Sequence, residues 1–406
     1  MANKRIYYAI QQVNLGRGGN LGNGYPIHGL QSVGVSTNFS LEQVFELGQL
    51  EIYQNVEEVP EVEVTLNKVL DGYPPIYLMA TQSGGTSEAG TSLAGTDPSG
   101  PADLAKNITL AGRQNARCDV KLGIFTDAKT AAEQGEAALQ TLLCRGMYVS
   151  SVSYTFPVDG NFTEDVTLVG NSKEWHTASS NFTPLTGGFL EATPDGPADA
   201  STGLFGKGTV GRRQFLDIPN CLFPIEIPGV QGNGTLVDNG STGDGFSTHF
   251  QNITVSCDLG RESINELGRF APYHRYATFP IEVTSEFEVL SIDGDGISAT
   301  EEGYWTGDPA APTVATGAEP KCQLRYNLRD QTIIIKTCEG LTLDLGTKNK
   351  LTSVNYSGGD TGGGNVTVSY SYSTYNKLDV DHIYTDVANA SQALASAGAV
   401  LGSQPN

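Results

Sequence analysis

The chain has 406 residues and a formal net charge of −21, with 45 acidic against 24 basic residues. This balance argues against a groove that holds nucleic-acid phosphates, because such grooves are basic. The 49 glycines, the 19 prolines and the few long helix-forming runs predict a mainly β (α+β) fold with long surface loops. The six cysteines contain no C-x-x-C pair, so we expect neither a zinc framework nor a dense disulfide scaffold, and free thiols fit a reducing compartment.

Residues 1–30 are expected to form an N-terminal arm. A strand-like segment, Arg5–Gln12, leads into the Gly-rich stretch Leu15–Gly29, which is too flexible to fold alone and is either disordered or laid against a neighbour. The N-terminus has no apolar signal core, and no window approaches the roughly 18 apolar residues of a membrane span. We therefore expect a soluble, unexported protein with no membrane insertion.

The stretch Gln31–Leu70 occurs a second time as Gln251–Leu290, at a constant offset of 220. The two share 11 of 40 residues without a gap, where unrelated segments would share roughly two or three. A second block, Ser151–Tyr154, matches Ser353–Tyr356 at an offset of 202, and Val166–Thr167 matches Val366–Thr367. The order of these blocks predicts two tandem copies of one fold. Copy 1 is expected over 31–175, with a loop insertion at about 73–117, and copy 2 over 251–383. Between them we expect a β-rich insertion or outer elaboration over 176–250, and after them a C-terminal tail over 384–406.

The repeated stretch predicts a strand, a short helix and a second strand. Gln31–Thr37 alternates like a strand, and Ser40–Gln43 resembles a capping box for a helix that ends near Gly48. Glu61–Leu66 predicts a strand with one apolar and one carboxylate face, and a bulge near Asn67 would bring Val69 into phase. In copy 2 the carboxylates of the matching strand are Glu282, Glu286 and Glu288.

The rest of each copy is predicted to be strands and hairpins, with one further helix. In copy 1 we expect a strand at Asp119–Phe125, a helix from Asp127 to about Cys144 that stops at Gly146, and a hairpin of Met147–Phe156 with Thr163–Val169. In copy 2 the predicted strands are Gln323–Leu328, Gln331–Thr337, Leu341–Leu345, Leu351–Tyr356 and Asn365–Tyr372.

No catalytic pattern emerges from the sequence. The five histidines lie far apart, and no G-x-S-x-G, H-E-x-x-H or Walker A stretch occurs. Asp293–Gly296 resembles the start of a calcium loop, but Ser298 stands where glycine is required and Tyr304 where glutamate should close the site. We therefore expect no enzyme, no metal and no cofactor.

The order of strand, short helix ending in Glu-Leu-Gly, strand and long hairpin resembles the tube-forming proteins of bacteriophage tails and related contractile injection machines. The residues that carry the resemblance are Phe45–Gly48, Pro60–Leu70, Tyr148–Trp175 and Arg329–Tyr375, so it covers both copies but not residues 176–250. It implies two tandem tube-type β-sandwich or half-barrel domains, each with a short helix, that assemble into a β-barrel ring. Because this chain would carry two such domains, as some long-tailed phage tube proteins do, the implied ring is a trimer with pseudo-sixfold symmetry.

The resemblance also implies a setting and partners. The protein would be a tail tube subunit of a virion, assembled in the host cytoplasm, whose stacked rings let DNA pass without sticking during ejection. Its partners would be further copies of itself and other tail, baseplate or terminator proteins. The alternatives are a baseplate hub or tail-end ring of the same fold, a β-rich capsid decoration or carbohydrate-binding module, and an unsuspected hydrolase.

Two sets of residues are candidates for roles in such a tube. Carboxylates on the predicted strands could line the pore, although a solvated outer face is the other reading of a half-buried strand. The candidate lumen-facing acids are Glu61, Glu63, Glu282, Glu286 and Glu288. Glycine-rich segments suit contacts that order only against the next ring. The candidate ring-stacking contacts are Gly16, Arg17, Gly18, Gly359, Asp360 and Gly363.

Overall fold

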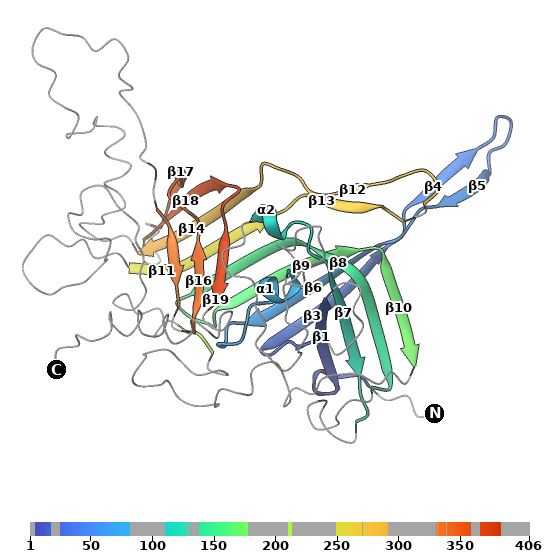
Figure 1. Cartoon of the computed structure of the whole chain (residues 1–406). Helices are drawn as coiled ribbons and strands as arrows, with labels where there is room; N and C mark the ends of the chain where they lie inside the picture. The colour runs from blue at the N-terminus through green and yellow to red at the C-terminus, as the bar shows by residue number, and fades with distance from the viewer. Residues whose placement is uncertain are drawn as a thin grey trace, which may run out of the picture.

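The computed structural model describes residues 5–17, 25–81, 110–127, 131, 138–177, 210–212, 249–269, 271–290, 330, 332–337, 339–358 and 366–382. Within them the protein is mainly β, as the composition predicts (Figure 1). Long strands alternate apolar and polar residues, so each strand buries one face.

Eight antiparallel strands form one continuous sheet. Its order is β17 (Lys350–Ser357), β18 (Thr367–Tyr375), β14 (Glu282–Leu290), β11 (His249–Asp258), β8 (Gln140–Pro157), β9 (Thr163–Gly170), β6 (Glu61–Val69) and β3 (Leu30–Asn38). The first four strands come from copy 2 and the last four from copy 1, so β11 and β8 join the two halves side by side. We call the β11–β8 pairing the internal seam.

Shorter strands pack on the apolar side of this sheet. In copy 1 the long strand β8 continues into a second layer with β7 (Cys118–Ile124), β1 (Gln11–Arg17), β2 (Tyr25–Pro26) and β10 (Ser172–Thr177). In copy 2 the layer is β15 (Ile334–Lys336), β16 (Leu341–Asp344) and β19 (Asp379–His382). Buried residues of both layers and both copies belong to a single apolar core.

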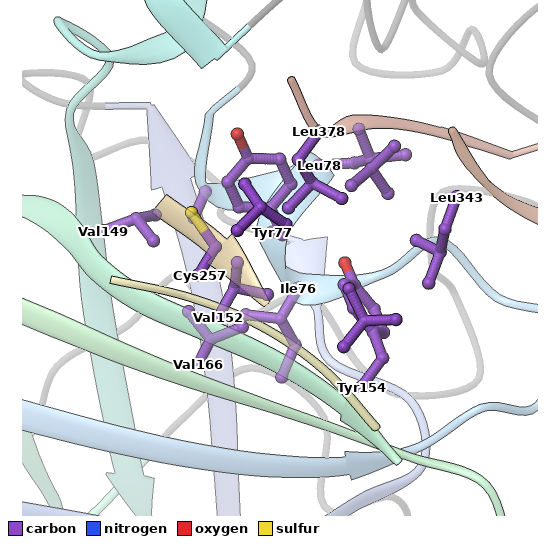
Figure 2. Packing of buried hydrophobic residues seen from close by; sticks show 14 of the residues in the cluster. Ile76, Tyr77, Leu78, Val149, Val152, Tyr154, Val166, Cys257, Leu343 and Leu378 are labelled. Carbon is purple, nitrogen blue, oxygen red and sulfur yellow. The ribbon is translucent and has the colours of Figure 1, made fainter. Parts of the chain in front are cut away.

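The short helix α1 (Ile76–Ala80) lies in this core, with a 3₁₀ turn at Tyr8–Ile10 and helix α2 (Leu110–Arg113) elsewhere in copy 1. All five residues of α1 are buried. Figure 2 shows Tyr77 and Leu78 among Cys257, Leu343 and Leu378, which belong to copy 2. Helix α1 therefore packs between the two copies, on the apolar side of the internal seam.

The helix predicted between Ser40 and Gly48 is wrong. These residues form a β-hairpin, β4 (Leu41–Phe45) with β5 (Ile52–Glu57), and copy 2 repeats it as β12 (Arg261–Ile264) with β13 (His274–Ala277). The capping pattern is outweighed by cross-strand pairing with Ile52–Glu57, which includes the β-formers Ile52, Tyr53 and Val56. In both copies a glycine with positive φ, Gly48 or Gly268, lies in the turn.

The helix predicted from Asp127 to Cys144 is also wrong at its C-terminal end. Gln140–Cys144 begins β8, which is paired on both sides, with β7 and with β10. Gly146 is not a helix stop: it has φ +63° at the point where the β7–β8 register shifts, and its N–H donates to Asp119 at 2.8 Å. Two ladders of backbone hydrogen bonds outweigh the local helical pattern.

The N-terminal arm and the 73–117 insertion are more structured than expected. β1 pairs along its whole length with β7, and Val13 and Leu15 are buried. Helices α1 and α2 lie within the segment that was expected to be a loop insertion.

The two copies correspond strand by strand, with one correction to the offset. Each first strand bulges at an equivalent glutamine, Gln31 or Gln251, so the bulge lies opposite the predicted position rather than at Asn67. Cys257 is paired with Val283 where Thr37 is paired with Val62, so the second strands correspond at an offset of 221 rather than 220. The hairpins β8–β9 and β17–β18 correspond as Ser151 with Ser353 and Thr163 with Thr367, offsets of 202 and 204, so the match of Val166–Thr167 with Val366–Thr367 is wrong.

The strand predicted at Arg5–Gln12 is wrong over most of its length, because Tyr8–Ile10 form a 3₁₀ turn and β1 begins at Gln11. The other strand predictions within the described residues are confirmed. They are the strands found as β3, β6, β7, β8, β9, β14, β15, β16, β17 and β18. The predictions for residues 178–209, 213–248, 291–329 and 383–406 lie outside the described residues.

Candidate functional site: a polar sheet face and its two open edges

One face of the eight-stranded sheet is polar in both copies. The row of directly opposed residues that crosses it from β18 to β6 is Ser373, Thr284, Ser256, Ser153, Asp165 and Asn67. The hydroxyls of Ser256 and Thr284 lie 2.7 Å apart, and the Asn67 amide donates to Asp165 at 2.6 Å. The face is therefore covered by short polar side chains held in cross-strand hydrogen bonds.

The acids predicted from the sequence lie on this face. Glu61 and Glu63 alternate with buried valines on β6, and Glu282, Glu286 and Glu288 alternate with buried residues on β14. The paired residues of the face carry seven carboxylates, these five with Asp165 and Asp258, and one amine, that of Lys350. Lys350 is itself bound to Asp330 at 2.8 Å. The pore-facing role of these acids stays a prediction.

Two of the predicted ring-stacking residues are placed in strands. Gly16 and Arg17 lie in β1 opposite Asp119 and Cys118 of β7. The other four, Gly18, Gly359, Asp360 and Gly363, lie outside the described residues. Their role in stacking stays a prediction.

The sheet ends in two open edges within the described part of the chain. β3 is paired on one side, by β6, and β17 is paired on one side, by β18. Neither edge strand carries a proline. Whereas β8 and β14 are paired on both sides, β3 and β17 are each paired on one side among the described strands. An uncovered edge of this length is a template for another strand.

Two hairpins extend from the sheet, and Figure 1 shows both on the same side of the molecule. In the copy 1 hairpin, β4–β5, the exposed apolar residues include Leu41, Phe45, Leu47, Leu50 and Tyr53. Exposed apolar residues in such a contiguous segment mark an interaction surface. The two hairpins have the same register: Leu41 opposes Glu57 as Arg261 opposes Ala277.

The copy 2 hairpin is docked on copy 1 through Arg275. This buried guanidinium donates to Glu61 at 2.8 Å and to the side-chain oxygen of Asn171 at 3.1 Å and 3.3 Å. Asn171 in turn donates to the backbone oxygen of Pro60 at 3.0 Å. A charge-assisted pair with this many partners fixes the hairpin on the end of β6.

A second anchor lies at Arg261 and Tyr148. Arg261 donates to the backbone oxygens of Val149 and Gln114 at 2.6 Å and 2.5 Å, and its guanidinium lies 5.3 Å from the Tyr148 ring centroid. The Tyr148 hydroxyl lies 2.8 Å from His274 Nδ1. Burial lowers the pKa of Arg261 to about 10, and burial also lowers the pKa of His274, which favours the neutral imidazole.

A polar cleft of about 560 Å³ lies where the bases of the two hairpins meet. Its lining includes Glu57, Glu58 and Glu61 on one side and Arg275 and Asn265 on the other. The pair Glu57–Glu58 borders this cleft, and Glu61 is already paired with Arg275. The cleft therefore belongs to the contact between the two copies.

The described residues contain no group of three or more histidine, cysteine, aspartate or glutamate side chains that could hold a metal ion. Three of the six cysteines, Cys118, Cys144 and Cys257, are free and buried, and burial raises the pKa of each thiol. Among the helices that the structure describes, none has the length and apolar character needed to span a bilayer.

Sequence reasoning found the acids but missed the edges and the hairpins. A comparison of the two copies would have shown the difference: at the offset of 220, two arginines of copy 2, Arg261 and Arg275, are replaced in copy 1 by the uncharged residues Leu41 and Asn55. An apolar residue aligned with a polar anchor indicates a surface used differently in the two copies.

Comparisons with known proteins give structural similarities only. No family model matches the chain, and no curated protein matches it. It is similar to a solved structure of the tube-terminating cap of the anti-feeding prophage, with 12% identity, a TM-score of 0.28, and coverage of 44% of this chain and 95% of that chain.

Further similarities are to proteins in related particles. A baseplate structure of the anti-feeding prophage matches at 11% identity and a TM-score of 0.29, covering 44% of this chain and 98% of that chain. A sheath/tube terminator of an extracellular contractile injection system matches at 13% identity and a TM-score of 0.26, covering 44% and 100%. TM-scores below 0.3 do not show a common fold over the whole chain.

Proposed function

We propose that this protein is a structural subunit of a phage-type tail tube, whose copies close into rings that stack into a conduit for DNA. The observation that carries the proposal is the eight-stranded sheet, which is built from two equivalent four-stranded units and ends in two open edges. Closing such a sheet on itself removes its edges. Three chains would supply six four-stranded units, which gives a trimeric ring with pseudo-sixfold symmetry.

The polar face suits the lumen of this ring. The opposite face is buried against the second layer and the core, so it cannot line a channel. Serine, threonine and asparagine side chains offer DNA no basic groups to bind, and seven carboxylates repel its phosphates. At physiological ionic strength this repulsion reaches about 8 Å, so acids on the wall itself act where remote charges would not.

The role is structural and needs no catalytic group. Within the same proposal, the tube would form in the host cytoplasm and become part of the virion tail, in contact with baseplate and terminator proteins. A tube subunit is distinguished from a terminator or hub by what it builds, because the latter stops at one ring.

Negative-stain microscopy of the purified chain tests the proposal. We expect rings with a central channel that stack into cylinders of variable length. Single rings that never stack would favour the terminator or hub. A chain that stays monomeric at high concentration, or that forms particles without a channel, would overturn the proposal.

The lumen assignment has its own test. In the triple variant Glu282→Gln, Glu286→Gln, Glu288→Gln, particles should assemble normally and eject DNA more slowly, with the largest difference at low salt, because wall repulsion is lost. The matched control is Glu174→Gln on β10, away from the polar face. Equal ejection rates in the triple variant and the parent at low salt would place these acids on an outer face.

A further inference from the structure

The internal seam shows how one copy of the fold binds another. β11 is paired antiparallel with β8 from Asn252–Pro157 to Asp258–Ser151, and backbone hydrogen bonds extend the pairing at both ends. Leu259 N–H donates to Ser150 at 2.8 Å, and Val158 N–H donates to Gln251 at 2.8 Å. The seam is therefore a complete edge-to-edge contact between a first strand and a hairpin strand.

Both halves of this seam occur a second time in the chain, at the open edges. β3 is the copy 1 equivalent of β11, and β17 is the copy 2 equivalent of β8. The bulges agree, because Gln31 matches Gln251 and Thr352 matches Ser150. Each open edge thus has the local geometry of a strand that is already paired elsewhere in the same molecule.

Two residues at the internal seam are buried, whereas the equivalent residues at the open edges are exposed, as expected if a partner strand is missing there. Leu259, which follows β11, is 1% exposed, whereas its equivalent Phe39, which follows β3, is 67% exposed. Tyr154 on β8 is 0% exposed, whereas its equivalent Tyr356 on β17 is 67% exposed. These aromatic residues stand at positions that are buried wherever the seam is formed.

We propose that β3 of one chain pairs antiparallel with β17 of a second copy, in the register of the internal seam. This assigns the residue pairs, and it rests on the proposed ring. Copying the internal register through the offsets of 220 and 202 gives Asn38 with Ser353, Thr37 with Val354, Ser36 with Asn355, Val35 with Tyr356, and Gly34 with Ser357.

The same copying places the β4–β5 hairpin on the second copy. The β12–β13 hairpin lies on Tyr148 and Glu61, whose equivalents in copy 2 are Lys350 and Glu282. Leu41 would therefore lie over the aliphatic stem of Lys350, where Arg261 lies over Tyr148. Asn55 would face Glu282, where Arg275 binds Glu61. The contact between chains is thus more apolar than the internal one.

Cysteine pairs test the register directly. Because Leu259 and Ser150 form a hydrogen-bonded pair, Asp258–Ser151 and Ser256–Ser153 are non-hydrogen-bonded pairs, whose Cα atoms lie about 4.5 Å apart. That separation suits a disulfide. The equivalent pairs between chains are Asn38–Ser353 and Ser36–Asn355, and all four of these side chains are exposed in the single chain.

The test variants are Ser36→Cys with Asn355→Cys and, as a second pair, Asn38→Cys with Ser353→Cys. After mild oxidation we expect most chains to appear in disulfide-linked multimers on a non-reducing gel. The control Ser36→Cys with Ser353→Cys is displaced by two residues, to about 7–8 Å, and should stay monomeric. The parent chain controls for the native cysteines, and Ser153→Cys with Ser256→Cys should link within one chain.

The outcomes separate this inference from the proposed function. Rings or cylinders by microscopy with no linkage in either test pair would overturn the seam and leave the tube proposal intact. Equal linkage in the displaced control would overturn the register. Absence of any assembly, while Ser153→Cys with Ser256→Cys links within the chain, would overturn both.

Discussion

Phe39 and Leu259 occupy equivalent positions in the two copies, and replacing each by alanine should have opposite consequences. Leu259 is 1% exposed inside the folded chain. Leu259→Ala should therefore lower the free energy of unfolding by about 2–5 kcal/mol, through lost burial and the cavity left behind. Phe39 is 67% exposed, so Phe39→Ala should change the free energy of unfolding of the single chain by no more than about 0.5 kcal/mol.

The effect of Phe39→Ala should appear in association instead. Burying a phenylalanine side chain contributes about 1.5–3 kcal/mol, and about two-thirds of that, roughly 1–2 kcal/mol, remains to be gained when the second copy covers Phe39. The dissociation constant of each contact between chains should therefore rise roughly 5- to 30-fold. A closed trimer contains three such contacts, so ring formation should be strongly impaired.

Two measurements separate these effects. Urea unfolding at a concentration too low for assembly gives the stability of the single chain, and sedimentation velocity over a concentration series gives the association. The reasoning is refuted if Phe39→Ala destabilises the single chain as much as Leu259→Ala does, or if it leaves association unchanged.

Three further predictions concern the fold that presents the edges. Buried Glu164 accepts hydrogen bonds from the backbone of Ile76 and Tyr77, at 2.6 Å and 3.0 Å, and from the Tyr154 hydroxyl at 3.0 Å. In urea unfolding, Glu164→Ala should lower the free energy of unfolding by about 3–5 kcal/mol and Glu164→Gln by clearly less, and equal losses would contradict this. Burial raises the pKa of Glu339 from 4.5 to about 7, so the free energy of unfolding of the parent should fall by roughly 3 kcal/mol as pH rises between these values. Thermal melting over this pH range should show the fall in the parent and not in Glu339→Gln. Gly29 and Gly146 have similar φ values, +69° and +63°, but an added Cβ would collide with Asp71 only at Gly29. In urea unfolding, Gly29→Ala should therefore cost more than the roughly 1 kcal/mol expected for Gly146→Ala, and the reverse order would show that this collision does not determine the loss of stability.

The long strands could be predicted from the sequence because their patterns are set by burial of one face. Val62, Val64 and Leu66 alternate with polar residues on β6, and the structure buries these three. The same alternation in β14 placed its carboxylates on the opposite face. Periodicity of two is a direct record of a half-buried strand, so these predictions needed no tertiary information.

The hairpins and the start of β8 could not be predicted in this way because local helical patterns compete with strand pairing. Ser40–Gln43 does match the capping-box pattern, but Leu41–Phe45 instead forms an antiparallel ladder with Ile52–Glu57. Gln140–Cys144 gains two ladders at once, one with β7 and one with β10. Strands β4 and β5 are close in sequence, so two local patterns compete there for the same residues. The partners of Gln140–Cys144 lie 16 or more residues away, beyond a local window.

The internal repeat predicted which strands correspond between the two copies but not how the copies join. An offset of 220 aligned Pro60 with Pro280, and one inserted residue then moved the second strands to 221. The seam itself pairs residues about 100 apart, such as Val152 with Cys257, whose identities carry no pairing signal. Edge strands are recognised only once the order of the sheet is known.

Duplication within one chain lets the two kinds of seam differ in chemistry. β11 and β8 belong to one chain and meet at high effective concentration, so the internal seam can include polar anchors such as Arg275 with Glu61 and Asn171. A contact between chains must instead form from separate molecules, where desolvating a guanidinium costs more than it returns unless its pairing is complete. Copy 1 presents Leu41 and Asn55 at the positions of Arg261 and Arg275, together with exposed Phe39. The open seam is thereby driven by apolar burial, which tolerates small errors of approach and still fixes the register through β3 and β17.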